Sequence, residues 1–205
     1  MVIAAWMPAR ENRATTDVVT PPDGLLISLA DAKGHLQLDS DFTGDDGRIT
    51  ALIRTAADYI ENEAGIAIQA QVLAARFDRF SPVLRLVRGP VSVVNSVKYF
   101  DQNGALQTVP AEQCRVSRRR NVALIEMLPG HTWPDTQRAM DAVAVEYQAG
   151  YSDAGLYPSQ ALHAARILVR HWYDHPDLQV TGTIATTLSH TVDALINQIR
   201  DRSEG

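Results

Sequence analysis

The chain lacks several features that would narrow its function quickly. It has a single cysteine, Cys114, among 205 residues. It therefore forms no internal disulfide, which is typical of a protein made in a reducing compartment. No apolar run approaches the roughly 20 residues needed to cross a bilayer. The short apolar start has no basic stretch before it, and Pro8 and Arg10 interrupt it early, so it is a poor signal peptide. We expect a soluble, cytoplasmically made protein with no membrane association.

Sequence signatures of catalysis are also absent. The chain contains no Walker loop, no G-x-S-x-G, no G-x-G-x-x-G and no cysteine–histidine signature. Cys114 lies in a β-prone stretch, where a buried structural thiol is more typical than a nucleophile. Ser189 and His190 are adjacent in sequence, which does not give the geometry of a catalytic triad. We expect no enzymatic activity and no cofactor.

The stretch "HWYDHPD" is the one pattern that suggests a metal site. On a helix, His171 and His175 are four residues apart and share a face, as a bidentate site requires. However, the H-E-x-x-H glutamate is missing, Pro176 ends the helix one residue later, and no third ligand is obvious. Histidines near a helix C-terminus are favoured anyway, because their positive charge meets the negative helix end. We interpret the pair as a helix terminus and keep a metalloenzyme as the weaker alternative.

The formal net charge of −5 is unevenly distributed, with acidic ends and a mildly basic middle. This balance excludes a dedicated nucleic-acid-binding domain, which would show a strong basic excess. The clearest basic run is "RVSRRRN", with Arg118, Arg119 and Arg120 at its centre. One interpretation is a solvated hairpin tip. The other is a contact with phosphate groups, in which each arginine supplies charge without sequence information.

Apolar spacing predicts two helices near the N-terminus. Ser28 is a credible N-cap of the first, with Asp31 in the capping-box position. The second shows i, i+3, i+4 apolar spacing and ends at Gly65. The aspartate-rich loop between them lacks the order of an EF-hand, so Asp45 or Asp46 is expected to cap the second helix and not to bind calcium.

The C-terminal part predicts two further helices. A long one begins at Pro158 and ends before Pro176. Residues 180–187 are β-prone and should be extended. Ser189 is then expected to cap a short final amphipathic helix that needs a partner surface.

Between the helices, residues 69–147 show the alternation and turn chemistry of short β-strands. Asn103 and Gly104 predict a hairpin turn. The expected fold is α+β: a helical body of two N-terminal helices, one long C-terminal helix and a short terminal helix, with an inserted antiparallel β subdomain. The predicted segments are an extended N-terminal arm (1–24), a helical segment (25–68), the β subdomain (69–150), the long helix (151–176) and a C-terminal docking segment (177–205).

Four stretches occur in an order that resembles the head–tail connector family. They are "LISLADAKGHLQLD", "LIRTAADYIENEAG", "RGPVSVVNSVKYFDQNGALQTV" and "VEYQAGYSD" followed by "YPSQALHAARILVRHWYDHPD". Members of this family are adaptor or head-completion proteins of long-tailed bacteriophages, prophages and gene transfer agents. The resemblance spans about residues 22–200, its motifs are structural, and none is an active site. Residues 1–21 lie outside it.

The resemblance implies a structural role at the head–tail junction of a phage-like particle. Such adaptors form a ring of about twelve copies under the portal protein and extend the channel that DNA crosses. A tail-side completion or stopper protein is then the partner at the other end. A tail-completion or tube-end protein is the alternative location, and the sequence separates the two poorly.

This role suggests three sets of contact residues. A cyclic ring needs heterologous subunit contacts, for which the small-residue helix faces are candidates, with ordinary intrachain packing as an equal alternative: Ala56, Ala57, Ile60, Ala161, Ala164 and Ala165. The C-terminal segment is expected to dock on the portal through Val180, Thr183, Ile184, Leu188, Val192, Leu195, Ile196 and Ile199. Deleting residues 178–205 should then abolish portal attachment and leave the fold intact. Arg118, Arg119 and Arg120 are the candidate contacts with DNA in the channel.

Overall fold

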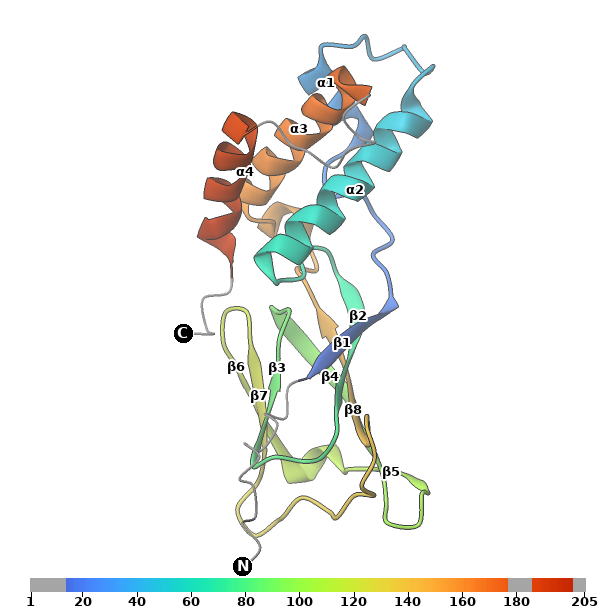
Figure 1. Cartoon of the computed structure of the whole chain (residues 1–205), viewed down its shortest axis with the longest axis vertical. Helices are drawn as coiled ribbons and strands as arrows, with labels where there is room; N and C mark the ends of the chain where they lie inside the picture. The colour runs from blue at the N-terminus through green and yellow to red at the C-terminus, as the bar shows by residue number, and fades with distance from the viewer. Residues whose placement is uncertain (1–13, 177–185, 201–205) are drawn as a thin grey trace, which may run out of the picture.

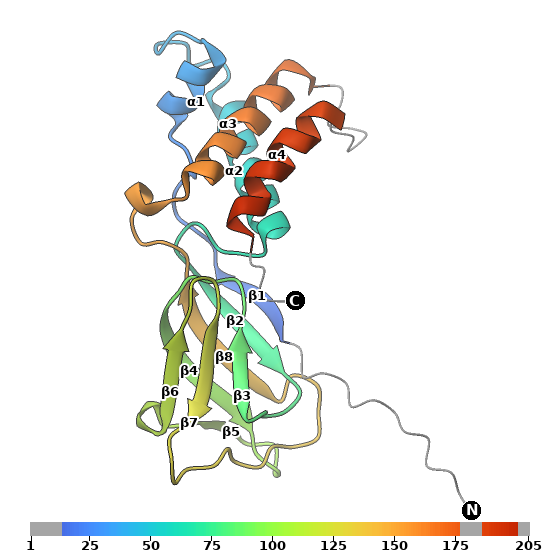
Figure 2. The same ribbon diagram turned by 90° about the vertical axis from the view of Figure 1, so that its left-hand side faces the viewer.

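The computed structural model describes residues 14–176 and 186–200. The molecule is elongated, with the helices gathered at one end and the strands at the other (Figure 1). Figure 2 shows the same division after a quarter turn about the long axis. The α+β class expected from the sequence is confirmed.

The helical end contains four α-helices: α1 (Leu29–Leu36), α2 (Asp46–Ala64), α3 (Ser159–Asp174) and α4 (Thr186–Ile199). The first begins as predicted, because the Ser28 Oγ accepts a hydrogen bond from the Asp31 N–H at 3.0 Å. The second ends as predicted at Gly65, whose φ of 68° is the left-handed conformation that glycine favours at a helix end. The third ends at Asp174, just before Pro176.

The start of α4 differs from the prediction. The helix begins at Thr186, so Ser189 lies inside it and is not its N-cap. The expectation of extended chain over residues 180–187 is therefore wrong for the last two, and residues 180–185 lie outside the described part. Ser189 ranked highest as a cap on its side-chain type alone, and threonines at positions 186 and 187 are equally compatible with a helix start.

The two aspartates before α2 do more than the sequence indicated. Asp45 occupies the N-cap position without a side-chain cap bond, and its carboxylate accepts a hydrogen bond from the Tyr173 hydroxyl at 2.6 Å. Asp46 forms an ion pair of 2.6 Å with Lys33, whose side chain is 7% exposed. Both carboxylates therefore join α2 to other parts of the helical end.

The strand end consists of two antiparallel sheets. A five-stranded sheet has the order β1-β2-β8-β4-β5, and a three-stranded sheet has the order β3-β7-β6. The strands are β1 (Thr15–Thr20), β2 (Gln71–Phe77), β3 (Val83–Leu86), β4 (Val91–Phe100), β5 (Leu106–Thr108), β6 (Cys114–Arg118), β7 (Ala123–Met127) and β8 (Val143–Ala149). The predicted hairpin at Asn103 and Gly104 joins β4 to β5, and Gly104 has a φ of 80°.

One strand comes from the predicted N-terminal arm. Thr15–Thr20 forms β1, which pairs antiparallel with β2 and places Thr15 opposite Arg76. An ion pair of 2.8 Å between Asp17 and Arg76 joins the same two strands. The expectation of an arm that needs a partner is therefore wrong for these residues, because their partner is a strand more than 50 positions later in the same chain. Residues 1–13 of the arm lie outside the described part.

The molecule contains two separate hydrophobic cores. Apolar side chains of the four helices form the first. The second lies between the two sheets and includes Leu73, Ile125 and Tyr147, each fully buried. None of the described helices is both long enough and apolar enough to cross a membrane.

A buried carboxylate organises the junction between the two ends. Glu61, near the end of α2, is 6% exposed. Its Oε1 accepts hydrogen bonds from the Ile68 N–H at 2.6 Å and the Gln69 N–H at 3.1 Å, and its Oε2 accepts one from Gln71 Nε2 at 2.8 Å. The carboxylate thus satisfies the backbone of the α2–β2 connection, which would otherwise be buried without partners.

The return connection, from β8 to α3, passes very close to the first. Gln69 and Tyr151 form an isolated parallel bridge between the two connections. Gly150, beside Tyr151, has a φ of 92°, and a Cβ placed on it would lie 2.1 Å from the Gln69 carbonyl oxygen. Only glycine fits this crossing, because any side chain would collide with backbone.

Candidate functional site

The histidine pair lies at the end of α3, as the sequence indicated. The rings of His171 and His175 have centroids 5.0 Å apart. The His175 backbone N–H donates to the His171 carbonyl oxygen, and the His175 Nδ1 lies 3.1 Å from the same oxygen. Desolvation, followed by the nearby His175, lowers the pKa of His171. These contacts fit a helix terminus, and the described residues contain no group of three or more histidine, cysteine or acidic side chains placed to hold a metal ion.

Cys114 is half-buried on β6, where its Sγ lies 3.8 Å from the Met127 Sδ. Burial, and secondarily the charge of Glu112, raises the pKa of its thiol. A raised pKa keeps the thiol protonated near neutral pH, which is the opposite of what a nucleophilic cysteine requires. His190 is exposed on α4, and the side chain of Ser189 lies outside the described part.

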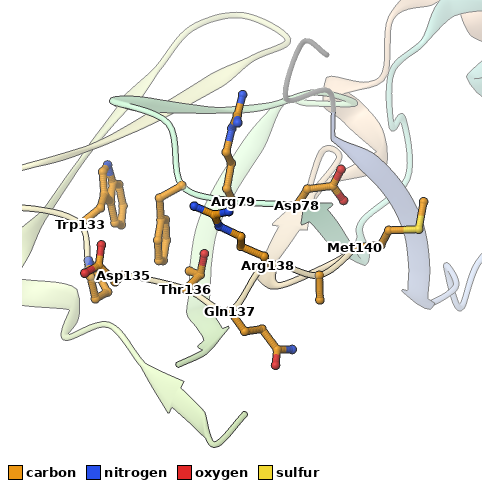
Figure 3. Close-up of a pocket in the computed structure, with 11 residues that line it drawn as sticks. Asp78, Arg79, Trp133, Asp135, Thr136, Gln137, Arg138 and Met140 are labelled. Carbon is orange, nitrogen blue, oxygen red and sulfur yellow. The ribbon is translucent and has the colours of Figure 1, made fainter. Parts of the chain in front are cut away.

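A distal groove of about 810 Å³ lies at the strand end of the molecule, where the β2–β3 turn meets the loop before β8 (Figure 3). Phe80 and Trp133 stack in it with ring centroids 4.5 Å apart. Its two carboxylates are already engaged: Asp78 accepts from the Asp141 N–H at 3.1 Å, and Asp135 accepts from Gln102 Nε2 at 3.3 Å. The groove therefore offers aromatic and mixed-charge surface, and its acidic groups serve the loop structure.

The helix faces proposed for subunit contacts are buried inside the chain itself. Each of the six residues is between 0% and 7% exposed in the helical core: Ala56, Ala57, Ile60, Ala161, Ala164 and Ala165. Their small side chains allow α2 and α3 to approach closely. Of the two alternatives that the sequence left open, intrachain packing is the one that the structure shows. The prediction of a subunit interface on these faces is corrected accordingly.

Most of the described residues proposed for portal docking are also internal. Val192, Ile196 and Ile199 on α4 are 1% to 3% exposed in the helical core, and Leu195 is half-buried against it. The partner surface that this amphipathic helix needed is the chain's own core. Val180, Thr183, Ile184 and the side chain of Leu188 lie outside the described part.

The arginine run forms the tip of the β6–β7 hairpin, as one of the two interpretations expected. The Arg119 N–H donates to the Val122 carbonyl oxygen at 2.7 Å and closes the tip. Arg118, Arg119 and Arg120 are exposed. None of the three forms an ion pair with a described residue.

Asn121 anchors this tip to both neighbouring parts of the molecule. It is 6% exposed. Its carbonyl oxygen accepts from the Gly89 N–H at 2.9 Å, and its Nδ2 donates to the carbonyl oxygen of Ile199, the last residue of α4, at 3.4 Å. The arginines are therefore held where the strand end meets the helical end, beside the end of α4 (Figure 2).

Two further arginines lie next to this anchor, and the sequence gave no signal for either. Arg88 precedes Gly89 and donates to Asn62 Oδ1 at 3.3 Å. Arg200 follows Ile199, donates to the Glu63 carbonyl oxygen at 3.0 Å and pairs with the Glu63 carboxylate at 3.4 Å. Both line a hollow of about 360 Å³ at the end of α2. They are 30 and 80 positions from the hairpin tip, so only the fold brings them together.

No protein-family model matches the chain, and no curated protein sequence matches it. Three solved structures contain chains of similar fold, and in each case the similarity covers 93% of this chain and 98% of the other. The first is the neck of an empty gene transfer agent particle computed with C6 symmetry, with 22% identity and a TM-score of 0.74. The second is the virion of a native gene transfer agent particle, with 23% identity and a TM-score of 0.74. The third is the neck of a native particle computed with C12 symmetry, with 22% identity and a TM-score of 0.67.

The similarity covers both ends of the molecule, because 93% of the chain cannot be matched by the helices or the strands alone. It confirms the fold that the sequence resemblance implied. The chain has the fold of a protein chain from the neck and virion of gene transfer agent particles.

Proposed function

We propose that the chain is a structural neck protein of a phage-like particle, which assembles as a ring and carries out no catalysis. The observation that carries this proposal is the match of fold over nearly the full length of both chains, with the helical body and the β subdomain in the same arrangement. The C6 and C12 symmetries of the similar neck structures are consistent with a ring of about twelve copies.

The finer proposal is an adaptor that binds under the portal, joins capsid to tail and extends the DNA channel. A tail-side completion or stopper protein would bind its other end. Since the alanine-rich faces are internal, the contacts between copies in such a ring must come from side chains on the surface. This separates folding from assembly: the helical core forms within one chain, and ring contacts are added afterwards.

Portal docking remains our proposal for the C-terminal segment, in a narrower form. The buried face of α4 holds the helical core together, so the docking contacts would come from Val180, Thr183, Ile184 and Leu188. Deleting residues 178–205 would also remove α4 and expose its core contacts. This deletion is therefore no longer a clean test, and single substitutions replace it.

Electron microscopy of the chain mixed with the portal ring from the same genome tests the proposal. We expect a new collar on the outer end of the portal. An I184D variant should fail to form it, because a carboxylate would be buried at the contact. L156D is the matched control, since Leu156 is 62% exposed and its substitution should leave the collar unchanged.

Bare portal rings, with the chain capping tail tubes, would replace the adaptor role by the tail-completion alternative. Bare portals and bare tubes together would contradict a neck function. A collar that forms equally well with I184D would contradict the docking assignment alone.

A further inference from the structure

Five arginines from three separate segments converge at the level where the two ends of the molecule meet. We call them the waist patch: Arg88, Arg118, Arg119, Arg120 and Arg200. Asn121 holds the segments together, because its backbone bonds Gly89 and its side chain bonds the last carbonyl of α4. Each segment therefore contributes an arginine one position away from a shared contact.

The five arginines divide into two groups by what they touch. Arg118, Arg119 and Arg120 are exposed and have no ion pair with a described residue. Arg88 and Arg200 donate to Asn62 and Glu63 in the last turn of α2. The tip arginines thus provide free cationic groups, and the other two serve the helix end beside them.

The second group has an electrostatic effect on the first. The C-terminal end of a helix carries a partial negative charge, which repels anions. Both α2 and α4 end near the hairpin tip, and Glu63 adds a full negative charge there. Arg88 and Arg200 offset these negative charges, so the field of the three tip arginines remains positive.

We propose that the waist patch binds the phosphodiester backbone of double-stranded DNA. A corollary, which rests on the proposed neck function, is that the side of the chain bearing the β6–β7 tip faces the DNA channel. Unpaired arginines on an exposed hairpin tip can reach phosphates from outside a duplex. They lack neighbouring groups of the described chain that would select a base sequence.

Three phosphate contacts give weak binding with a shallow salt dependence. The logarithm of the binding constant falls with the logarithm of salt concentration by about 0.9 for each phosphate neutralised, so a slope near −2.7 is expected for three. The rest of the chain carries a net negative charge and repels DNA. This combination orients a duplex at the patch without trapping it, which suits a channel that DNA must pass.

The test uses the full-length chain and a short duplex of mixed sequence at low salt. Nuclear magnetic resonance of ¹⁵N-labelled arginine side chains detects binding even at millimolar affinity. We expect the signals of Arg118, Arg119 and Arg120 to shift on titration and to return as salt is raised. The triple variant R118E/R119E/R120E should lose at least nine-tenths of the binding, taking about one slope unit of salt dependence per contact.

R138E is the matched control. Arg138 is exposed in the distal groove, at the far end of the β subdomain from the waist patch (Figure 3). It undergoes the same charge change and should retain most of the binding. R88Q and R200Q should weaken binding several-fold less than R119Q, because these two arginines act through the field at the helix ends. Circular dichroism of each variant checks that the fold is kept.

Unshifted arginine signals in the wild-type chain would overturn the proposal, as would equal losses for the triple variant and R138E. If the triple variant loses the collar on the portal while the wild-type chain shows no DNA binding, an acidic protein surface is the partner, which also overturns it. The proposed neck function is tested separately, because a collar can form whether or not the patch binds DNA.

Discussion

The helical end and the strand end of this molecule use their surfaces in opposite ways. In the helical end, small and branched apolar residues are almost entirely internal, and ion pairs such as Asp31–Arg166 and Lys33–Asp46 join neighbouring helices. The strand end has a smaller core, and its surface carries the unpaired arginine tip and the distal groove. The helical end is therefore a self-sufficient scaffold, and the strand end carries most of the open surface available to partners.

The two ends are joined by only two connections, both organised by a few residues. Glu61 fixes the first, and the close crossing at Gly150 fixes the second. We therefore expect variants at this junction to break the relation between the ends. Variants inside one end should instead show whether the two cores unfold together.

The largest effect is expected for G150V. The new Cβ would lie 2.1 Å from the Gln69 carbonyl oxygen, and the φ of 92° is itself unfavourable for valine. We expect little or no folded protein, measured as loss of soluble yield and of cooperative thermal unfolding. G34A is the control: a Cβ at this helical position meets nothing within 4 Å, and alanine should stabilise the helix by about 0.5–1 kcal/mol. A folded G150V chain with wild-type thermal stability would contradict the crossing described here.

A smaller loss is expected for E61A. It removes three hydrogen bonds and leaves the N–H groups of Ile68 and Gln69 buried without an acceptor. Each unsatisfied group costs about 1–3 kcal/mol, so the free energy of unfolding should fall by about 3 kcal/mol in urea titration. E63A is the matched control. Glu63 is 49% exposed and pairs with Arg200 at 3.4 Å, and this substitution should cost less than about 1 kcal/mol. Equal losses for the two variants would show that Glu61 does not organise the junction.

Local patterns predicted most helix ends and strands correctly, because these depend on neighbouring residues. Ser28 and Gly65 are examples, since each satisfies backbone groups within one turn of its own position. The use of the apolar faces could not be predicted in the same way. A face of alanines packs equally well against its own chain or a neighbour, and only the fold showed that Ala161 meets residues of the same chain.

Long-range pairing was the other source of error. The sequence of β1 is rich in threonine and valine but has no nearby strand to pair with, so it was expected to be an arm. Its partner β2 begins more than 50 residues later. The same limitation hid Arg88 and Arg200, whose place in the waist patch depends on Asn121 joining distant segments.

A pH-dependent effect is expected in the core of the strand end. Burial raises the pKa of Tyr147 from 10.0 to about 12, partly offset by a hydrogen bond with Thr16 and the charge of Arg88. The neutral form is therefore favoured in the folded state. Its contribution is fully present below pH 10 and is lost as the pH rises from about 10 to about 12, a change of about 3 kcal/mol.

Y147F isolates this contribution. It also removes the hydrogen bond that the Tyr147 hydroxyl donates to the Val87 carbonyl oxygen at 2.6 Å, so we expect it to be about 1–2 kcal/mol less stable near neutral pH. Above pH 10 its stability should fall less steeply than that of the wild type in urea titrations at fixed pH. Parallel alkaline profiles for the two proteins would show that Tyr147 does not titrate with the unfolding transition.

The smallest effect is expected on the surface of the helical end, and it sharpens the comparison with Tyr147. Arg170 and Asp174 form an ion pair of 2.7 Å one turn apart on α3, with both side chains 41% exposed. A double-mutant cycle with R170A and D174A should give a coupling of about 0.3–0.5 kcal/mol that decreases at high salt. Arg170 also donates to the His35 carbonyl oxygen at 3.2 Å, so R170A alone should cost more than D174A. If the two cores unfold together, amides of both ends should show the same loss of hydrogen-exchange protection in Y147F and R170A, scaled to each variant's stability. Protection lost only in the strand end of Y147F would show that the two ends unfold separately.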